Sequence, residues 1–201
     1  MKKLLLVLIF LSGFYGGAFA AVGCDLNDPD RDVKRFFPES TGYKTAYMSL
    51  DRLGGQELLQ QVETRLGDKF TGLYETIDVP YTVYTIFKDK EIIGYIHGIN
   101  QKGKYGGLQV FLIYDTKGTI TNFYYQKLTN KEAKKMRSPA FGAQFKGLSF
   151  GDFKNYDPLS HTGMPKVIKG EGDDFFSTLR AVKKNLILMD IFVFNNKGTV
   201  K

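Results

Sequence analysis

The side chains that most often perform acid–base or nucleophilic chemistry are scarce in this sequence. It contains two histidines, His97 and His161, and a single cysteine, Cys24. A zinc site built from cysteine and histidine is therefore excluded, and a cysteine–histidine nucleophile is a poor interpretation. His97 stands in an apolar, strand-like stretch typical of a structural histidine, and His161 stands in a loop rich in turn-forming residues. We expect no catalytic residue and no metal site.

A glycine-rich stretch lies near the middle of the chain but lacks the pattern of a nucleotide-binding loop. Residues 103–107 read GKYGG, and no Gly-Lys-Ser/Thr follows to open a helix as in a P-loop. The carboxylates are scattered, and no pair has a local spacing that indicates acid–base work. The residues therefore give no support to a hydrolase or a transferase.

Alternating aromatic and β-branched residues predict an antiparallel sheet, and apolar residues at helical spacing predict helices around it. Lys88-Asp89-Lys90 and Thr116-Lys117-Gly118 are the expected hairpin turns. The expected strands are 81–88, 91–98, 108–115 and 119–127, and the expected helices are 56–66, 130–137, 141–145 and one long helix that starts near residue 173. We predict an α+β fold, with an antiparallel sheet of hairpins packed against a long C-terminal helix and shorter helices.

The predicted C-terminal helix ends in a nearly continuous apolar run. Asp173 or Asp174 is suited to be its N-cap, and an apolar stripe follows from Phe175 to Val182. Residues 186–194 are almost entirely apolar but too few to cross a bilayer. We interpret them as a buried helix end that continues into a strand.

The N-terminal residues read as an export signal. Lys2 and Lys3 precede the apolar stretch Leu4–Phe14, and small residues follow it. Two cleavage positions remain open: an A-x-A site ending at Ala20, which would release a soluble protein, and a lipobox-like stretch ending at Cys24. Because the only cysteine of the chain cannot form an internal disulfide, lipidation of Cys24 is the favoured interpretation.

These features predict an exported, lipid-anchored protein on the periplasmic face of a bacterial membrane, with a soluble periplasmic or secreted protein as the alternative. We expect a signal peptide over residues 1–23, a tether over residues 24–50 and one globular domain over residues 51–201. The net charge of +7 is spread along the chain without a long basic run, so nucleic acid is not an expected partner.

The order of several short segments resembles the FMN-binding domain of the periplasmic flavin-carrying subunits of sodium-pumping NADH:quinone reductases and related electron-transport complexes. The segments are Ile93-Gly94-Tyr95, Tyr105–Val110 (YGGLQV), the turn 115–120, Phe141 with Gln144–Gly147 (QFKG), and the final helix. The likeness covers about residues 81–188. It implies FMN as the cofactor, electron transfer as the function and a membrane electron-transport complex as a partner.

The resemblance also implies which residues would meet the flavin. Members of the family carry FMN joined through its phosphate to a Thr or Ser just before the final helix, and Thr178 falls at that position. Gly106 and Gly107 would permit close approach of the backbone to the flat ring system, and Tyr105 and Phe141 would pack against it.

The attachment motif departs from the family pattern. Where relatives have Ser-Gly-Ala-Thr-x-Thr, residues 173–178 read DDFFST. Two acidic residues at a helix N-terminus repel a phosphate group. Covalent FMN, noncovalent FMN and no flavin therefore remain three alternatives. The function is either electron transfer by an FMN-binding-like protein or, alternatively, that of a non-redox lipoprotein binding or assembly module that has kept the fold and lost the flavin.

Overall fold

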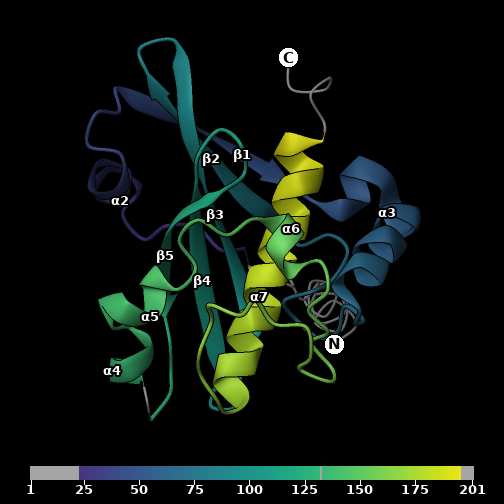
Figure 1. The fold of residues 1–201 in the computed structure, drawn as a ribbon. Helices are drawn as coiled ribbons and strands as arrows, with labels where there is room; N and C mark the ends of the chain where they lie inside the picture. The colour runs from purple at the N-terminus through teal and green to yellow at the C-terminus, as the bar shows by residue number, and fades with distance from the viewer. Residues whose placement is uncertain (1–22, 132, 196–201) are drawn as a thin grey trace, which may run out of the picture.

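A computed structural model describes residues 23–131 and 133–195, which form an antiparallel sheet with helices on both faces (Figure 1). The sheet has five strands that follow one another in chain order as a meander. They are β1 (Gly42–Met48), β2 (Tyr81–Lys88), β3 (Glu91–Lys102), β4 (Gly107–Tyr114) and β5 (Ile120–Lys127). The predicted antiparallel sheet of hairpins is confirmed.

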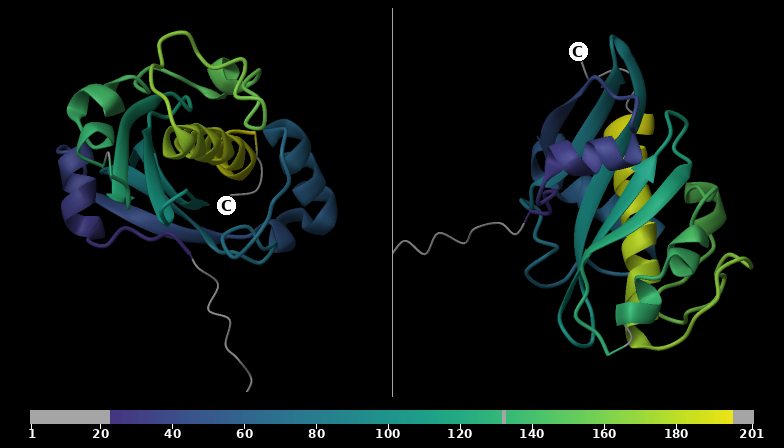
Figure 2. Two further views of the ribbon diagram at one scale, coloured as in Figure 1. Left: turned by 90° about the horizontal axis from the view of Figure 1, so that it is seen from below. Right: turned by 90° about the vertical axis from the view of Figure 1, so that its left-hand side faces the viewer.

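The long C-terminal helix crosses one face of the sheet, as predicted, and a short helix covers the other face (Figure 2). The helices Leu50–Leu66 and Phe150–Phe153 also pack against the long helix, the helix Pro139–Ala143 packs against β5, and the helix Ala133–Met136 packs against Pro139–Ala143. The helices are α2 (Pro29–Phe36), α3 (Leu50–Leu66), α4 (Ala133–Met136), α5 (Pro139–Ala143), α6 (Phe150–Phe153) and α7 (Asp173–Met189), which continues into a π-helical turn, η1 (Asp190–Phe194).

The main core lies between the sheet and α7, because strand residues that alternate in direction meet the apolar stripe of the helix. Val83, Ile99 and Leu112 of the sheet are buried there with Leu179 and Leu186 of α7. Full burial of each such side chain stabilises the fold by about 1.5–3 kcal/mol. This packing fixes the N-terminal turn of α7 next to the loop between β3 and β4.

A second, smaller core lies on the opposite face of the sheet, under α2. Ile86, Ile96 and Phe111 point to this side and pack with Val33 and Phe37. The two cores together account for the alternation in the strands, since both faces of β2, β3 and β4 are covered. The segment just before α2 also belongs to this second core.

The segment expected from the sequence to be a tether contains α2 and the edge strand β1. Asp28 is the N-cap of α2 and accepts a hydrogen bond from the N–H of Arg31 at 3.1 Å, and Pro29 occupies the first turn. These are ordinary signals of a helix start. They were overlooked because the segment is polar, and because a helix that covers one face of a sheet needs only a few apolar residues, such as Val33.

The apolar run at the C-terminus is helical, so the prediction that it continues into a strand was wrong. The carboxylate of Asp190 pairs with the guanidinium of Arg65, and the ring of Phe194 packs on Tyr95 and Tyr114. An apolar run without alternation suits a buried helix end as well as a strand, and the pattern alone cannot distinguish them. No helix among the described residues has the length and apolar character needed to cross a membrane.

Candidate functional site

One carboxylate fastens the loop between β3 and β4 to the first turn of α7. Asp174 accepts the backbone N–H of Lys104 at 2.6 Å through Oδ1, and it accepts the side-chain amide of Asn130 through Oδ2. A Cβ at Gly103 would lie 2.6 Å from the same Oδ1, so the absence of a side chain there lets the carboxylate reach the loop. Asp174 is itself buried.

The expectation that Asp173 or Asp174 is the N-cap of α7 was wrong. The N-cap is Gly172, and no side chain bonds to the free N–H groups from that position. Asp173 lies in the first turn, where its carboxylate pairs with the ammonium group of Lys104 at 2.5 Å. The positive end of the helix dipole is therefore already next to two carboxylates.

A pocket of about 380 Å³, which we call the α7 pocket, opens beside this turn. Loop residues Lys104, Tyr105 and Lys131 line one side, and residues 171–175 line the other. Tyr105 is 47% exposed. Three carboxylates and two ammonium groups line the pocket, and one of the two ammonium groups is already paired, so the pocket does not favour an anion.

Thr178 lies on the buried side of α7 and does not open into the α7 pocket. Its side chain is 0% exposed. The hydroxyl donates to the backbone carbonyl of Asp174 at 2.7 Å and therefore accepts the hydroxyl of Tyr125, at 2.6 Å. Both hydrogen-bonding directions of the threonine hydroxyl are used inside the protein.

Phe141 is part of an aromatic cluster beneath β5. Its ring makes an edge contact with Phe175 at 6.3 Å and stacks with Tyr125 at 6.2 Å. Phe123 and Phe145, which stack on each other at 4.5 Å, complete the cluster. Phe141 is buried, and its ring contacts neighbouring aromatic rings and does not face an open pocket.

The two glycines of the loop are covered by protein atoms. Gly106 has φ of +142°, a conformation that favours glycine, and a Cβ there would lie 3.6 Å from Thr129. A Cβ at Gly107 would lie 3.0 Å from the hydroxyl of Tyr74. Glycine at these two positions permits the positive φ of Gly106 and leaves room for the side chains of Thr129 and Tyr74.

Further along α7, two cations are held in a buried ionic network. The ammonium group of Lys184 pairs with Glu75 at 2.8 Å, and the guanidinium of Arg180 pairs with the same carboxylate at 2.7 Å and with Asp68 at 2.6 Å. Arg180 also donates to Gln101 at 2.8 Å. Burial alone would raise the pKa of Glu75, but the neighbouring charges of Lys184 and Arg180 and their hydrogen bonds lower it to about 2.

A neutral histidine lies between the sheet and α7. Nδ1 of His97 is 2.8 Å from the side-chain oxygen of Asn185, whose amide nitrogen donates to the His97 carbonyl at 3.0 Å. The hydroxyl of Tyr114 donates to the same Asn185 oxygen at 2.8 Å. Complete burial lowers the pKa of His97 to about 4, as expected of the structural histidine that the sequence predicted.

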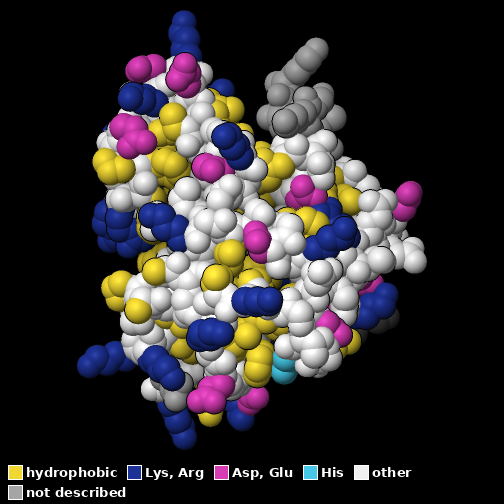
Figure 3. Space-filling view, viewed as in Figure 1, with side chains coloured by type: hydrophobic (Ala, Val, Ile, Leu, Met, Phe, Trp, Pro, Cys, Tyr) yellow, Lys and Arg dark blue, Asp and Glu magenta, His cyan; other side chains and the backbone are white. Residues whose placement is uncertain are grey.

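A second pocket, which we call the β5 groove, differs from the α7 pocket in charge. It has a volume of about 430 Å³ and lies between residues 121–125 of β5 and residues 136–146 of α4 and α5. Arg137 and Lys146 line it, and its described lining residues include no carboxylate. Figure 3 shows dark-blue Lys and Arg side chains over α2, α5 and α4 on the left-hand face, and magenta carboxylates at the lower end of α7.

The segment 23–27 is bonded to several strands of the sheet. The N–H of Leu26 donates to the hydroxyl of Tyr84 at 3.0 Å, and the amide of Gln126 donates to the carbonyl of Asp25 at 2.8 Å. Cys24 is 3% exposed in the second core, and burial raises the pKa of its thiol. In this arrangement the sulfur faces the protein interior.

The structure brings only some of the predicted flavin contacts together. Tyr105 lines the α7 pocket, Gly106 and Gly107 shape the loop behind it, and Phe141 and Thr178 lie in the core. The ionic network around Glu75 and the contact of Asp174 with the loop were missed, because their partners are far apart in the sequence. Among the described residues, no group of three or more His, Cys, Asp or Glu side chains is placed to hold a metal ion.

The residues that face the implied cofactor do not fit FMN attached at Thr178. An ester to the phosphate would require the hydroxyl to leave Tyr125 and the carbonyl of Asp174 and to reach solvent across a buried helix face. The phosphate would then meet Asp173 and Asp174, which repel it. The DDFFST sequence and the burial of the Thr178 hydroxyl therefore both argue against attachment at this residue.

Comparisons with known proteins give a limited result. No family model and no curated protein matches the chain. Among solved structures, a Na(+)-translocating NADH-quinone reductase subunit from Parabacteroides distasonis is similar, with 18% identity over 83% of each chain and a TM-score of 0.39. A likeness of this degree says nothing about the activity of the present chain.

Proposed function

We propose that the chain is an exported, non-redox binding or assembly module with a fold of the FMN-binding type and no flavin on Thr178. The observation that carries this proposal is the buried hydroxyl of Thr178, bonded on one side to Tyr125 and on the other to the helix backbone. A transferase has to reach the acceptor hydroxyl, and here the hydroxyl is buried within the first two turns of a packed helix.

The charges at the α7 pocket support the same conclusion. A carboxylate of the protein, Asp174, already accepts the N–H of Lys104 at the loop. An incoming phosphate would have to displace this carboxylate, which would then be left buried without its partners. Leaving a buried charged group without hydrogen bonds costs on the order of several kcal/mol.

The position of Cys24 supports release after Ala20 as the processing route. A thioether to diacylglycerol would require the sulfur to leave the second core, where it packs with Leu26 and Val33. The hydrogen bond from Asn100 to the carbonyl of Gly23, at 2.9 Å, shows that the chain is already held to the sheet one residue earlier. We therefore propose a soluble exported protein in which Cys24 is a core residue.

The test of the non-redox proposal is flavin content. The full chain, with its own leader, is expressed in a bacterial periplasm with and without a flavin transferase, and absorbance is recorded before and after acid precipitation. We expect a colourless protein in both cases. Flavin that stays with the precipitate in the wild-type protein and in Thr178→Ser, but not in Thr178→Ala, would overturn the proposal.

A noncovalent FMN carrier is the second candidate, because Tyr105 is exposed at the rim of a pocket of about 380 Å³. If FMN is bound noncovalently, acid precipitation in the same experiment releases the flavin from the protein into solution. Replacement of Tyr105 by alanine would then weaken FMN binding, whereas replacement of the exposed Tyr47 on β1 would not.

The test of processing is the mass of the mature chain. Cleavage after Ala20 gives a polypeptide that begins with Ala21. Cys24→Ala changes its mass only by the difference between the two residues and leaves its cleavage position and its location unchanged. A mass that includes acyl chains on Cys24, or retention in the membrane that Cys24→Ala abolishes, would overturn this part of the proposal.

A further inference from the structure

We propose that the β5 groove binds an extended acidic segment of a partner protein. The inference rests on the proposed function as a binding module and specifies the chemistry of its partner. It is carried by three features of the groove: its concave shape between β5 and α5, cations without described carboxylate partners, and a wall strand whose side chains are fixed in the two cores.

One wall of the groove is a strand whose outer edge has no strand neighbour. β5 is the last strand of the described sheet. Much of this edge is already used within the chain: the backbone of Ile120 bonds to Gly147 and Leu148, both at 2.8 Å, and α5 packs against β5. The guanidinium of Arg137 donates to the carbonyl of Tyr125 at 2.7 Å. A partner segment would therefore lie in the groove between β5 and α5 and contact its side chains, and it would not add a strand along β5.

The charge of the groove selects an acidic occupant. Arg137 and Lys146 line it, and Lys134 and Lys135 are exposed on the adjoining α4. None of these four cations takes part in an ion pair within residues 23–131 and 133–195. By contrast, Lys104 at the α7 pocket is paired with Asp173. Cations that the fold leaves without acidic neighbours attract carboxylates and steer their approach.

The aromatic side chains of β5 are held in place by their neighbours. The guanidinium of Arg35 lies 4.3 Å from the ring centre of Tyr124 on the α2 side of the sheet. On the other side, Phe123 meets Tyr125 edge to face at 4.7 Å in the main core. A strand whose side chains are fixed on both faces loses little conformational entropy on binding. Because side chains of an extended segment alternate in direction, the groove suits a partner in which acidic and apolar residues alternate.

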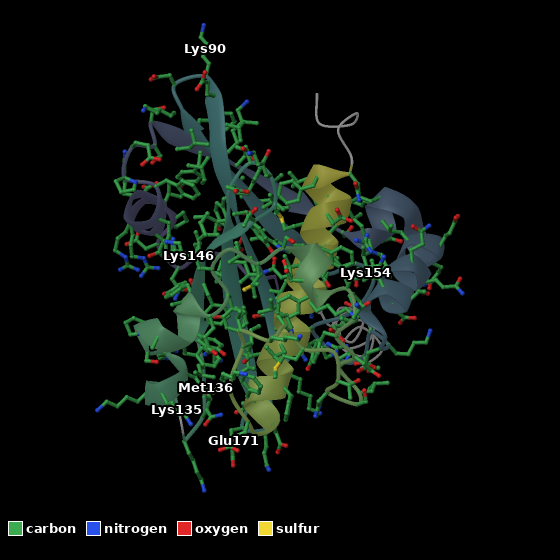
Figure 4. The ribbon with its side chains drawn as sticks, in the orientation of Figure 1. Lys90, Lys135, Met136, Lys146, Lys154 and Glu171 are labelled. Carbon is green, nitrogen blue, oxygen red and sulfur yellow. The ribbon has the colours of Figure 1, made fainter. Side chains whose placement is uncertain are left out.

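The shape favours a peptide over a membrane surface. Arg137 and Lys146 line a concave groove. In Figure 4, Lys146 and Met136 lie beside α5 and α4, and Lys135 extends outward from α4. A peripheral membrane site presents its cations and aromatic rings on a protruding surface that can reach the lipid headgroups. A groove walled by a strand edge accommodates a single chain.

The test uses the exported full chain as bait for a phage-displayed library of short random peptides. We expect enrichment of peptides that alternate Asp or Glu with apolar residues. A selected peptide is then synthesised with a fluorophore, and its dissociation constant is measured by anisotropy at low and at physiological salt. Lys146→Glu should weaken binding about tenfold or more, and the double variant with Arg137→Glu should weaken it further.

Lys90→Glu and Lys154→Glu are matched controls, because both are exposed lysines far from the groove, on the β2–β3 hairpin and after α6 (Figure 4). Lys146→Glu is the decisive variant, since the exposed side chain of Lys146 makes no ion pair within the described part of the chain. Binding that falls equally in the controls would contradict the inference.

Three other results would overturn it: no acidic enrichment in the library, equal affinity of Lys146→Glu, or binding to phosphatidylglycerol vesicles that is lost in Lys146→Glu while no peptide binds. Flavin content is measured on the same preparation. If the chain carries flavin and binds acidic peptides, only the proposed function is refuted. If the chain is colourless and does not bind acidic peptides, only the inference about the β5 groove is refuted.

Discussion

Helix α7 and the β5 groove are neighbours that differ in how their charges are paired. Along α7, charged groups that face inward meet partners of the same chain, as Asp174 meets the loop and Lys184 meets Glu75. In the groove, Arg137 and Lys146 have no described carboxylate beside them. Met136 lines both pockets, so the two environments are separated by little more than one side chain. A region whose charges are satisfied internally stabilises the fold, and one whose charges are not is available to a partner.

The largest effect on the α7 side is expected from Glu75→Gln. The substitution leaves Lys184 buried without its counter-charge and should lower the free energy of unfolding by about 3–5 kcal/mol. Denaturant titration measures the loss. Glu57→Gln, an exposed position on α3, is the matched control and should change stability by about 0.5 kcal/mol or less. Equal losses would mean that the ionic network is not what stabilises this half of the molecule.

Lowering the pH should reduce the free energy of unfolding through two groups that contact α7, His97 and Glu75. The pKa of His97 is lowered from 6.5 to about 4, so the unfolded chain binds a proton that the folded chain does not. Stability is complete above pH 6.5 and falls as the pH drops toward 4, by at most about 3 kcal/mol. Below pH 4.5 the lowered pKa of Glu75 adds a second loss that continues toward pH 2.

Chemical denaturation at a series of pH values tests this assignment. His97→Gln should make the free energy of unfolding nearly independent of pH between pH 6.5 and 4. The loss of stability below pH 4.5, which comes from Glu75, should remain. An unchanged slope in this variant would show that another group is responsible for the upper limb.

A smaller effect is expected at the loop. Asp174→Ala removes the acceptor for Lys104 N–H and for Asn130, and it should cost about 1–3 kcal/mol. Asp173→Ala removes only an exposed ion pair and should cost about 1 kcal/mol or less. Thermal unfolding of the two variants side by side measures the difference. If Asp173→Ala were the more damaging of the pair, the buried carboxylate of Asp174 could not be what fastens the loop to the helix.

The smallest effect on stability is expected in the groove. Lys146→Glu should change the free energy of unfolding by about 0.5 kcal/mol or less, because Lys146 is exposed. The same substitution should strongly affect peptide binding. A large loss of stability would show that Lys146 stabilises the fold as the paired charges of α7 do. The two regions would then not differ in the way described here.

The sequence predicted the parts of the fold that rest on local patterns. The strands of β2 to β5 and the long C-terminal helix were found from alternation, turn residues and helical spacing. α2 and β1 were not, because their apolar residues are few and take on meaning only against the opposite face of the sheet. The prediction of a strand after α7 was wrong for a related reason. An uninterrupted apolar run shows neither the alternation of a strand nor the spacing of a helix.

The candidate site was less predictable than the fold. The altered residues around Thr178 could be read directly from the sequence, but the burial of its hydroxyl could not. Glu75 and Lys184 are 109 positions apart and pair only because loop and helix meet. The groove depends on how α4 and α5 lie against β5, and a single sequence contains no periodic signal for that arrangement.

The bonded segment 23–27 has a consequence for the export proposed above. These residues complete the second core through Cys24 and Leu26 and join β2 to β5 through Tyr84 and Gln126. If residues 1–20 are a leader, as proposed, a leader held in the translocation machinery would keep the residues next to it away from the sheet. The contacts of segment 23–27 would then form only after cleavage, so cleavage would also complete the second core.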